Sequence, residues 1–124
     1  MSQFFTLLFL VSVFCAACVS KSADVHMISE EELSKELNDT NVIILDVRTP
    51  DEYQQGHILH AKLLNMYDEN FKEQLASCDK NKTYVVYCAS HGRSAKAAKV
   101  MMQEGFQKVY NLKYGFNHWE GKTE

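Results

Sequence analysis

The sequence predicts an α/β fold, an open and mostly parallel sheet flanked by helices on both faces. Short aliphatic and β-branched runs recur along the chain, and helical spacing or helix-capping residues separate them. The run at residues 42–45, Val-Ile-Ile-Leu, has no polar side chain, which is the pattern of a strand covered on both faces. Strands that alternate with helices in this way pair in parallel.

The first strand and the first helix are predicted at residues 25–37. Residues 25–28 form a short strand. Ser29 and Glu32 have the spacing of a capping box, so a helix starts there and runs through Leu37. Leu33 and Leu37 lie four residues apart on this helix, and we expect both to be buried.

The strand at 42–45 leads to a second helix with clear start and stop signals. Thr49 is the expected N-cap, Pro50 takes the first helical position, and Glu52 completes a second capping box. Gly56 is expected to stop this short helix.

The remaining elements continue the alternation of strands and helices. Asp68 is expected to cap a helix on which Phe71, Leu75 and Cys78 share one apolar face. Gly105 is the expected end of a later, alanine-rich helix. We predict a short strand at 62–65, a helix at 68–77, a strand at 83–88, a helix at 95–102, a strand at 108–112 and a closing turn at 116–119.

Composition limits the function classes. The 124 residues suit one domain, and 46% of them are hydrophobic, which is enough for a core. A net charge of −3 offers no basic surface for nucleic acid. The five histidines and the cysteines show no metal-ligand spacing, so we expect neither a metal nor a cofactor.

Residues 1–20 differ from the rest of the chain. Residues 4–17 are almost wholly apolar, and no charged side chain precedes Lys21. This pattern is typical of a signal peptide, so we expect a periplasmic or secreted domain at residues 25–121. Cleavage after Ala17 is the first expectation. Lipid attachment at Cys18, which would bind the domain to a membrane, is the second, and a retained anchor is the third.

Two cysteines lie outside the leader, and their spacing argues against a disulfide. Residues 83–88 form an extended run that rises about 3.3 Å per residue. Cys78 precedes this run and Cys88 ends it, so they exceed the roughly 7 Å limit between the Cα atoms of a disulfide. We expect Cys78 to be a packing residue and Cys88 to be a reactive one.

Cys88 lies between a strand and a helix N-terminus. Unpaired backbone N–H groups and the helix dipole favour negative charge at such a place, and therefore favour thiolate over thiol. We expect an uncovered sulfur within a bowl of main-chain donors. The competing interpretation is that Cys88 is a small buried apolar residue, as free cysteine often is.

Asp46 also ends a predicted strand, so it should share the functional edge of the sheet with Cys88. For Asp46 and Arg48 a structural pairing is favoured over catalysis, since a carboxylate beside the cysteine would oppose its ionisation. Arg93 is expected to organise substrate or loop, with anchoring to a carboxylate as the alternative. His91 is expected to be an exposed loop residue.

Several stretches, in their order and spacing, together resemble the rhodanese domain. They are Asp-Val-Arg-Thr-Pro-Asp-Glu-Tyr at 46–53, Gly-His-Ile at 56–58, Val-Tyr-Cys at 86–88 with Gly-Arg-Ser at 92–94, and Gly-Phe-Gln-Lys-Val-Tyr-Asn-Leu at 105–112, followed by Gly115 and Trp119. The resemblance covers residues 25–121. With the leader, the chain looks most like the small exported single-domain thiosulfate sulfurtransferases of bacteria.

This resemblance implies a persulfide mechanism. The Cys88 thiolate would attack the outer sulfur of thiosulfate, sulfite would leave, and the persulfide would pass its sulfur to cyanide or a thiol. The implied partners are therefore a small anionic sulfur donor and a nucleophilic acceptor. The implied site comprises Cys88 as nucleophile, Asp46 and Arg48 in support, and the active-site loop of Ala89, Ser90, His91, Gly92, Arg93 and Ser94.

Two alternatives remain open. Four residues separate Cys88 from Arg93, whereas related phosphatases and arsenate reductases have five, so phosphatase activity ranks well below sulfur transfer. The main alternative is a non-catalytic sulfur carrier or protein-interaction module. It is motivated by His91, which stands where family loops often have glycine and would be strained if that position needs a positive φ. Tyr114, in place of a frequent glycine, is expected to alter the rim of the site.

Overall fold

The computed structural model describes residues 25–124, so the predicted leader at 1–20 lies outside the described residues. Five strands form one parallel sheet in the order β1-β5-β4-β2-β3. The strands are β1 (His26–Ile28), β2 (Val42–Asp46), β3 (Lys62–Leu63), β4 (Thr83–Tyr87) and β5 (Lys108–Leu112). The helices are α1 (Glu30–Glu36), α2 (Pro50–Gln54), α3 (Phe71–Ala76), α4 (Gly92–Gln103) and the 3-10 turn η1 (Phe116–His118).

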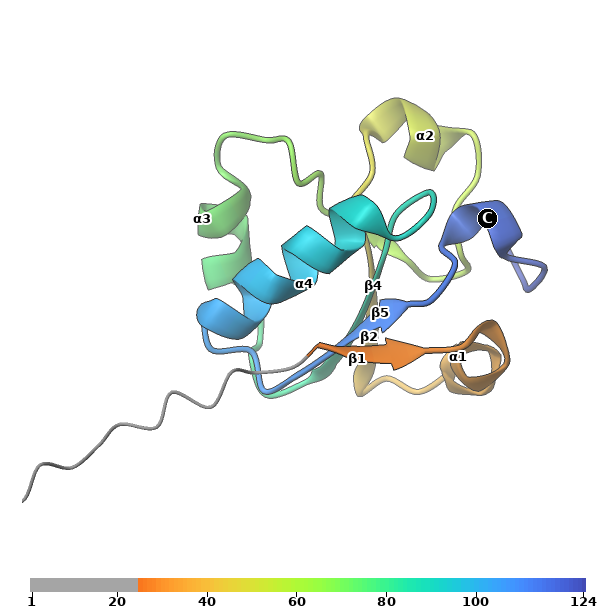
Figure 1. Cartoon of the computed structure of the whole chain (residues 1–124), viewed down its shortest axis with the longest axis horizontal. Coiled ribbons are helices and arrows are strands. Elements are labelled where there is room, and N and C mark those ends of the chain that lie inside the picture. Colours follow the sequence, from red (N-terminus) through yellow and green to blue (C-terminus); the bar gives the residue numbers. More distant parts are fainter. Residues whose placement is uncertain (1–24) are drawn as a thin grey trace, which may run out of the picture.

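Helices cover both faces of the sheet, which confirms the predicted fold class. In Figure 1, α3 and α4 lie on one side of the sheet, while α1 and the C-terminal segment lie on the other. Side chains alternate along β4 between these two layers, because successive residues of a strand point to opposite faces. Tyr84 and Val86 pack in the cluster that includes Leu75 and Met101, and Val85 packs in the cluster that includes Leu33.

The two predicted capping boxes are present and start α1 and α2. At α1, the Ser29 hydroxyl accepts from the Glu32 amide, and the Glu32 carboxylate accepts from the Ser29 amide. Thr49 and Glu52 exchange the same pair of bonds at α2. Each box satisfies two N–H groups that a helix start would otherwise leave unpaired. The second box also fixes where the Glu52 carboxylate lies.

Two predicted helix boundaries are wrong. Asp68 does not cap α3: the helix begins at Phe71 after Asn70, and the Asp68 carboxylate instead accepts bonds from the side chains of Asn65 and Gln74. The later helix, α4, begins at Gly92 rather than at residue 95. Asn and Asp side chains that bond locally compete with a cap position, which explains the first error.

The end of β4 and the free thiols of the two cysteines agree closely with the prediction from the sequence. β4 stops at Tyr87, one residue before the predicted end, so Cys88 is the first residue beyond the sheet. Cys78 and Cys88 are both free thiols, as expected. Cys78 is half-buried against the α3–α4 cluster, and burial raises the pKa of its thiol.

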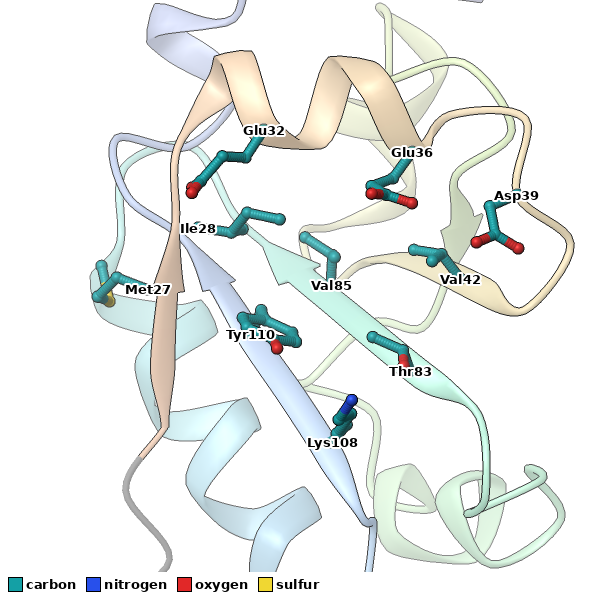
Figure 2. A pocket seen from close by; sticks show the side chains of 10 residues that line it. All are labelled: Met27, Ile28, Glu32, Glu36, Asp39, Val42, Thr83, Val85, Lys108 and Tyr110. Atoms are coloured by element: carbon teal, nitrogen blue, oxygen red, sulfur yellow. The ribbon is translucent and has the colours of Figure 1, made fainter.

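A hollow of about 410 Å³ lies beneath α1, at the end of the sheet opposite Cys88 (Figure 2). Its lining includes Val42, Thr83 and Lys108, which are the first residues of β2, β4 and β5. The reactive cysteine follows the other end of β4, so this hollow does not belong to the site described below. Within residues 25–124, no helix has the length and hydropathy needed to cross a bilayer.

Candidate active site

Cys88 joins the last residue of β4 to the loop that precedes α4. Asp46 ends β2, and it lies directly beside Tyr87 in the register of the two parallel strands. Cys88 and Asp46 therefore share the carboxyl edge of the sheet, where open α/β sheets bind their ligands. In Figure 1 the loop between β4 and α4 lies near α2 and the C-terminal turn.

The backbone of the loop is held from one side by η1. The Phe116 amide donates to the Cys88 carbonyl at 2.8 Å, and the Asn117 amide donates to the Ala89 carbonyl at 2.9 Å. In a trans peptide the N–H points opposite to the C=O, so the amides of Ala89 and Ser90 are turned away from η1. Within residues 25–124, the amides of residues 89–93 donate to no other group. The loop thus presents a run of free donors.

Gly115 allows this close approach. A Cβ atom at Gly115 would lie 2.1 Å from the Ser90 carbonyl oxygen, 2.6 Å from that of Ala89 and 2.7 Å from that of Cys88. The residue also has a φ of 69°, in the left-handed region that favours glycine. Only glycine therefore lets three consecutive carbonyls of the loop pack against the turn.

The Cys88 sulfur lies 3.3 Å from the Ser94 hydroxyl, which in turn donates to the His91 carbonyl at 3.2 Å. Ser94 is the third residue of α4, so the helix start places this hydroxyl beside the thiol. The expectation of an uncovered sulfur is wrong. Cys88 is only 1% exposed, because it packs in the apolar cluster that includes Ala97 and Met101 of α4.

His91 and Gly92 begin α4 without strain. His91 is the N-cap residue with a φ of −156°, which any residue adopts, and Gly92 has no positive φ either. His91 is exposed, as expected, and its side chain makes no capping bond. The substitution of histidine for glycine at this position therefore does not distort the loop.

Arg93 is paired with a carboxylate from α2. Its two terminal nitrogens bond to the two oxygens of Glu52 at 2.7 and 3.0 Å. The hydrogen bond from Arg93 lowers the pKa of Glu52 to about 2, and the same bond raises the pKa of Arg93. The sequence allowed both a substrate-binding and an anchoring role for Arg93, and the contacts are those of an anchor.

Asp46 and Arg48 form a buried ion pair, which agrees with the structural role expected for them. The Arg48 guanidinium donates two bonds to Asp46, at 2.7 and 3.0 Å to Oδ2, and a third at 2.9 Å to Oδ1. The Tyr87 hydroxyl donates to Asp46 Oδ2 at 2.7 Å and accepts from the Ile58 amide at 3.1 Å. Burial raises the pKa of Tyr87, so this hydroxyl remains a donor.

Arg48 also connects this pair to the turn that holds the loop. It donates to the Gly56 carbonyl at 2.7 Å, and its guanidinium carbon lies 4.3 Å from the centre of the Phe116 ring. Phe116 is the residue whose amide bonds to Cys88. The pair therefore supports the site indirectly, through Phe116, and makes no contact of its own with the sulfur.

Two exposed tyrosines and a histidine belong to the segments around the loop. Tyr114 is 58% exposed and precedes Gly115, and its ring lies 5.6 Å from that of His118. Tyr67 is 64% exposed and contributes, after Glu52 and Cys88, to the raised pKa of Arg93. Lys113 has its ammonium 5.2 Å from the Tyr114 ring. The segments that carry Tyr67 and Tyr114 thus add exposed aromatic side chains near the loop.

Sequence reasoning missed two residues that shape this site. Glu52 was explained by its capping box, and nothing in the spacing indicated a second contact with Arg93 41 positions later. Tyr87 was predicted only as a strand residue, and its hydroxyl was given no role. Tyr87 points to the opposite face of the sheet from Val86, and there its hydroxyl bonds to Asp46. Both contacts depend on tertiary neighbours that no local motif encodes.

Comparison with known proteins agrees with this geometry. The family model described as a rhodanese-like domain matches residues 29–122. A protein of Allochromatium vinosum named "Sulfurtransferase" is 38% identical over 96 residues, which are 77% of this chain and 88% of that protein. The crystal structure of a rhodanese-like domain protein from Staphylococcus aureus is similar with a TM-score of 0.69 and 32% identity, over 79% of this chain and 94% of that one.

A second solved structure, from Staphylococcus saprophyticus, has 30% identity and a TM-score of 0.67, over 77% of this chain and 93% of that one. The family match spans the strand ends, the loop and the closing turn that together surround Cys88. This chain belongs to the rhodanese-like domain family.

Proposed function

We propose that this protein is a sulfurtransferase that moves sulfane sulfur from a donor such as thiosulfate to a nucleophilic acceptor through a persulfide on Cys88. The observation that carries the proposal is the position of Cys88, at the start of a loop whose amides have no partner within residues 25–124. The name of the Allochromatium vinosum relative supports the same reaction class.

The first half of the reaction is nucleophilic attack by the Cys88 thiolate on the outer sulfur of thiosulfate. A new S–S bond forms at Cys88, the S–S bond of thiosulfate breaks, and sulfite leaves with the electron pair. The amides of residues 89–93, which have no partner within residues 25–124, and the N-terminus of α4 are available to bind the anionic donor and the leaving sulfite.

The second half returns the enzyme to its resting state. A nucleophile, cyanide or a thiolate, attacks the outer sulfur of the Cys88 persulfide, and the Cys88 thiolate leaves. The Ser94 hydroxyl lies 3.3 Å from the sulfur. While it donates to the His91 carbonyl it can accept from the Cys88 thiol, and by turning its one proton from that carbonyl to the sulfur it can donate to the thiolate. No cofactor is needed for either half.

The burial of Cys88 favours one alternative, a non-catalytic member of the family. A thiol with 1% exposure must become accessible before a donor can reach it. If the loop never opens, the domain binds a partner and transfers no sulfur.

One experiment distinguishes these functions. Residues 21–124 are incubated with thiosulfate and cyanide, and thiocyanate is measured together with the intact mass of the protein. We expect thiocyanate production and a gain of one sulfur, both absent in Cys88→Ser. A sulfur adduct without turnover would indicate a carrier, and no adduct at all, with a thiol that can be alkylated after unfolding, would indicate a binding module. Hydrolysis of an aryl phosphate would instead support the phosphatase alternative.

We further propose that the domain acts outside the cytoplasm. The apolar, uncharged residues 4–17 support export, with lipid attachment at Cys18 as the variant that would anchor it. The mass of the protein purified from its native host would distinguish cleavage after Ala17 from lipidation at Cys18 and from retention of the leader.

A further inference from the structure

The hollow beneath α1 leaves part of one face of the sheet without cover. It has a volume of about 410 Å³ and lies over the first residues of β2, β4 and β5, between these strands and α1 (Figure 2). Both faces of a parallel sheet are normally covered, so the strand starts lack cover at this place. The volume falls within the range of ligand pockets, about 300–1,000 Å³.

The floor of the hollow is apolar and continues into the core. Val85 and Ile28 are buried and belong to the core cluster that includes Leu33. Val42 and Tyr110 are half-buried and pack against the same cluster. These aliphatic side chains and the Tyr110 ring offer contact area to an apolar body placed above them.

Three carboxylates lie on the α1 side of the hollow. Glu32 and Glu36 are one helical turn apart on α1, and Asp39 follows in the turn before β2. Figure 2 shows both glutamates directed from α1 towards the sheet. Like charges four residues apart on a helix repel each other, so this arrangement is unfavourable unless a cation lies between them.

Within residues 25–124, no side-chain cation pairs with these three carboxylates. Lys35 is the basic residue of α1, and its ammonium pairs with Glu31 at 3.6 Å on the exposed side of the helix. Glu36 is half-buried. Glu32 accepts from the amide and the hydroxyl of Ser29, and these bonds lower its pKa, so its carboxylate stays charged at neutral pH.

The cation that lines the hollow, Lys108, lies on the side away from α1. It is the first residue of β5, and Figure 2 shows it at the far end of the hollow from the two glutamates. The lining therefore holds three carboxylates and one ammonium, a net charge of −2. This polarity attracts a positive group to α1 and repels a second one near β5.

We propose that the hollow binds an organic cation, with a single ammonium or guanidinium group against the carboxylates of α1 and an apolar body over Val85 and Tyr110. Such a ligand supplies the missing charge between the two glutamates and covers the floor of the hollow in one molecule. The site lies at the end of the sheet opposite Cys88, so it does not depend on the proposed sulfur transfer.

Other classes of ligand fit the hollow less well. An anion would meet three carboxylates, and a neutral apolar molecule would take water from them without offering a partner. A bare metal ion would leave the apolar floor unused, and within residues 25–124 no group of three or more His, Cys, Asp or Glu side chains is arranged to hold one. A polyamine would bring further positive charge towards Lys108.

The test uses three probes that share one apolar body and differ in charge. They are 4-phenylbutylamine, 4-phenylbutanol and 4-phenylbutyrate, of which only the amine is positive at pH 7. Each is added to isotope-labelled residues 21–124, which contain every helix and strand of the described structure, and amide chemical shifts are followed by NMR. We expect saturable shifts at Val42, Thr83 and Val85 with a millimolar Kd for the amine, about fivefold weaker binding of the alcohol, and no binding of the carboxylate.

Two variants of α1 assign the effect to the hollow. Glu36→Gln removes a charge that lines the hollow and should weaken binding of the amine about threefold without changing that of the alcohol. Glu31→Gln is the matched control, because it removes an equal charge from the exposed side of the same helix, and it should leave both affinities unchanged. The amide spectrum of each variant shows whether it is folded.

Two results would overturn the proposal. The first is an amine that causes no saturable shifts at the residues lining the hollow, or that shifts only amides elsewhere in the domain. The second is an alcohol that binds wild type as tightly as the amine does, or a Glu36→Gln variant that keeps the amine affinity of wild type. Neither result bears on sulfur transfer, because Cys88 takes no part in these measurements.

Discussion

The contact between the Cys88 sulfur and the Ser94 hydroxyl is where a single residue bears most directly on the proposed chemistry. The hydroxyl is fully buried, so no water replaces it when it is removed. Ser94→Ala should slow persulfidation of Cys88 by about tenfold to about a hundredfold, because a hydrogen bond to a charged group contributes roughly 1.5–3 kcal/mol. Quenched intact-mass kinetics measure this. Ser34→Ala, which removes a similar hydroxyl-to-carbonyl bond from α1, should not change the rate, and equal rates in all three proteins would exclude this role for Ser94.

Gly115 provides a second prediction at this scale, with a matched glycine elsewhere. Gly115→Ala forces a Cβ into three carbonyls, whereas the Cβ of Gly105→Ala, at a φ of 92°, meets no atom of residues 25–124 within 4 Å. Gly105→Ala should therefore lower the free energy of unfolding by only about 1–2 kcal/mol, the cost of a left-handed backbone for alanine. Gly115→Ala should cost more and abolish persulfidation, because the loop must move. Urea unfolding and mass kinetics test this, and similar losses in both variants would contradict it.

The predictability of the site differs from residue to residue. Cys88 and Ser94 were found from sequence because strand-forming residues, a cysteine and a helix start follow one another along the chain. The burial of Cys88 and the Arg93–Glu52 pair were not, because both depend on how α2 and the loop meet in space. A local pattern specifies which atoms a loop offers but not what covers them.

At the scale of elements, the Glu52–Arg93 pair ties the start of α2 to the start of α4. Because the pKa of Glu52 in the folded state, about 2, lies below its ordinary value of 4.5, the stabilisation is complete above pH 4.5. It is lost as the pH falls towards 2. Since Glu52 is one-third exposed, we discount the shift to about 1 kcal/mol of stability.

Glu52→Gln should therefore be less stable than wild type by about 1 kcal/mol at pH 7, and this difference should shrink between pH 4.5 and pH 3. Urea unfolding at pH 7, 4.5 and 3 gives the three differences. The same measurements on Asp51→Asn show how much the loss of any one carboxylate from this turn changes stability with pH, and this amount is subtracted. A difference that stays constant down to pH 3 would mean that the ion pair contributes no stability.

Elements with two independent local signals were predicted best. α2 has a capping box and a proline at its first position, and its start is correct to the residue. β2 is apolar on both faces and is likewise correct at its start. α3 had only Asp68 as a start signal, and that side chain bonds Asn65 and Gln74 instead. The start of α4 was predicted at residue 95 and not at Gly92, because Gly92 and Arg93 show no apolar periodicity.

For the molecule as a whole, one buried polar network joins segments that are far apart in the sequence. Asp46 ends β2, Tyr87 ends β4, and Ile58 belongs to the connector after α2. Arg48 extends the network to Gly56 and, by packing, to Phe116. Such a network in a low-dielectric core stabilises the fold only when each polar group is paired, so losing one hydrogen bond should weaken the others.

Tyr87→Phe tests this interdependence with a change of one oxygen atom. It leaves the Ile58 amide without a partner and removes one donor from Asp46, so unfolding should become easier by about 2 kcal/mol. Tyr84→Phe is the matched control: its hydroxyl, on the other face of the same strand, donates to the half-buried Asp79 carbonyl and should matter less.

The network also predicts an effect on the site itself. If Asp46 shifts in Tyr87→Phe, Arg48 shifts with it, and so does the Phe116 ring on which Arg48 packs. The Phe116 amide then holds the Cys88 carbonyl less firmly, so persulfidation should slow in Tyr87→Phe but not in Tyr84→Phe. Urea unfolding and quenched mass kinetics on the two variants measure both effects. Loss of stability with an unchanged persulfidation rate would mean that the buried pair supports the fold alone, and that η1 positions the loop without help from the network behind it.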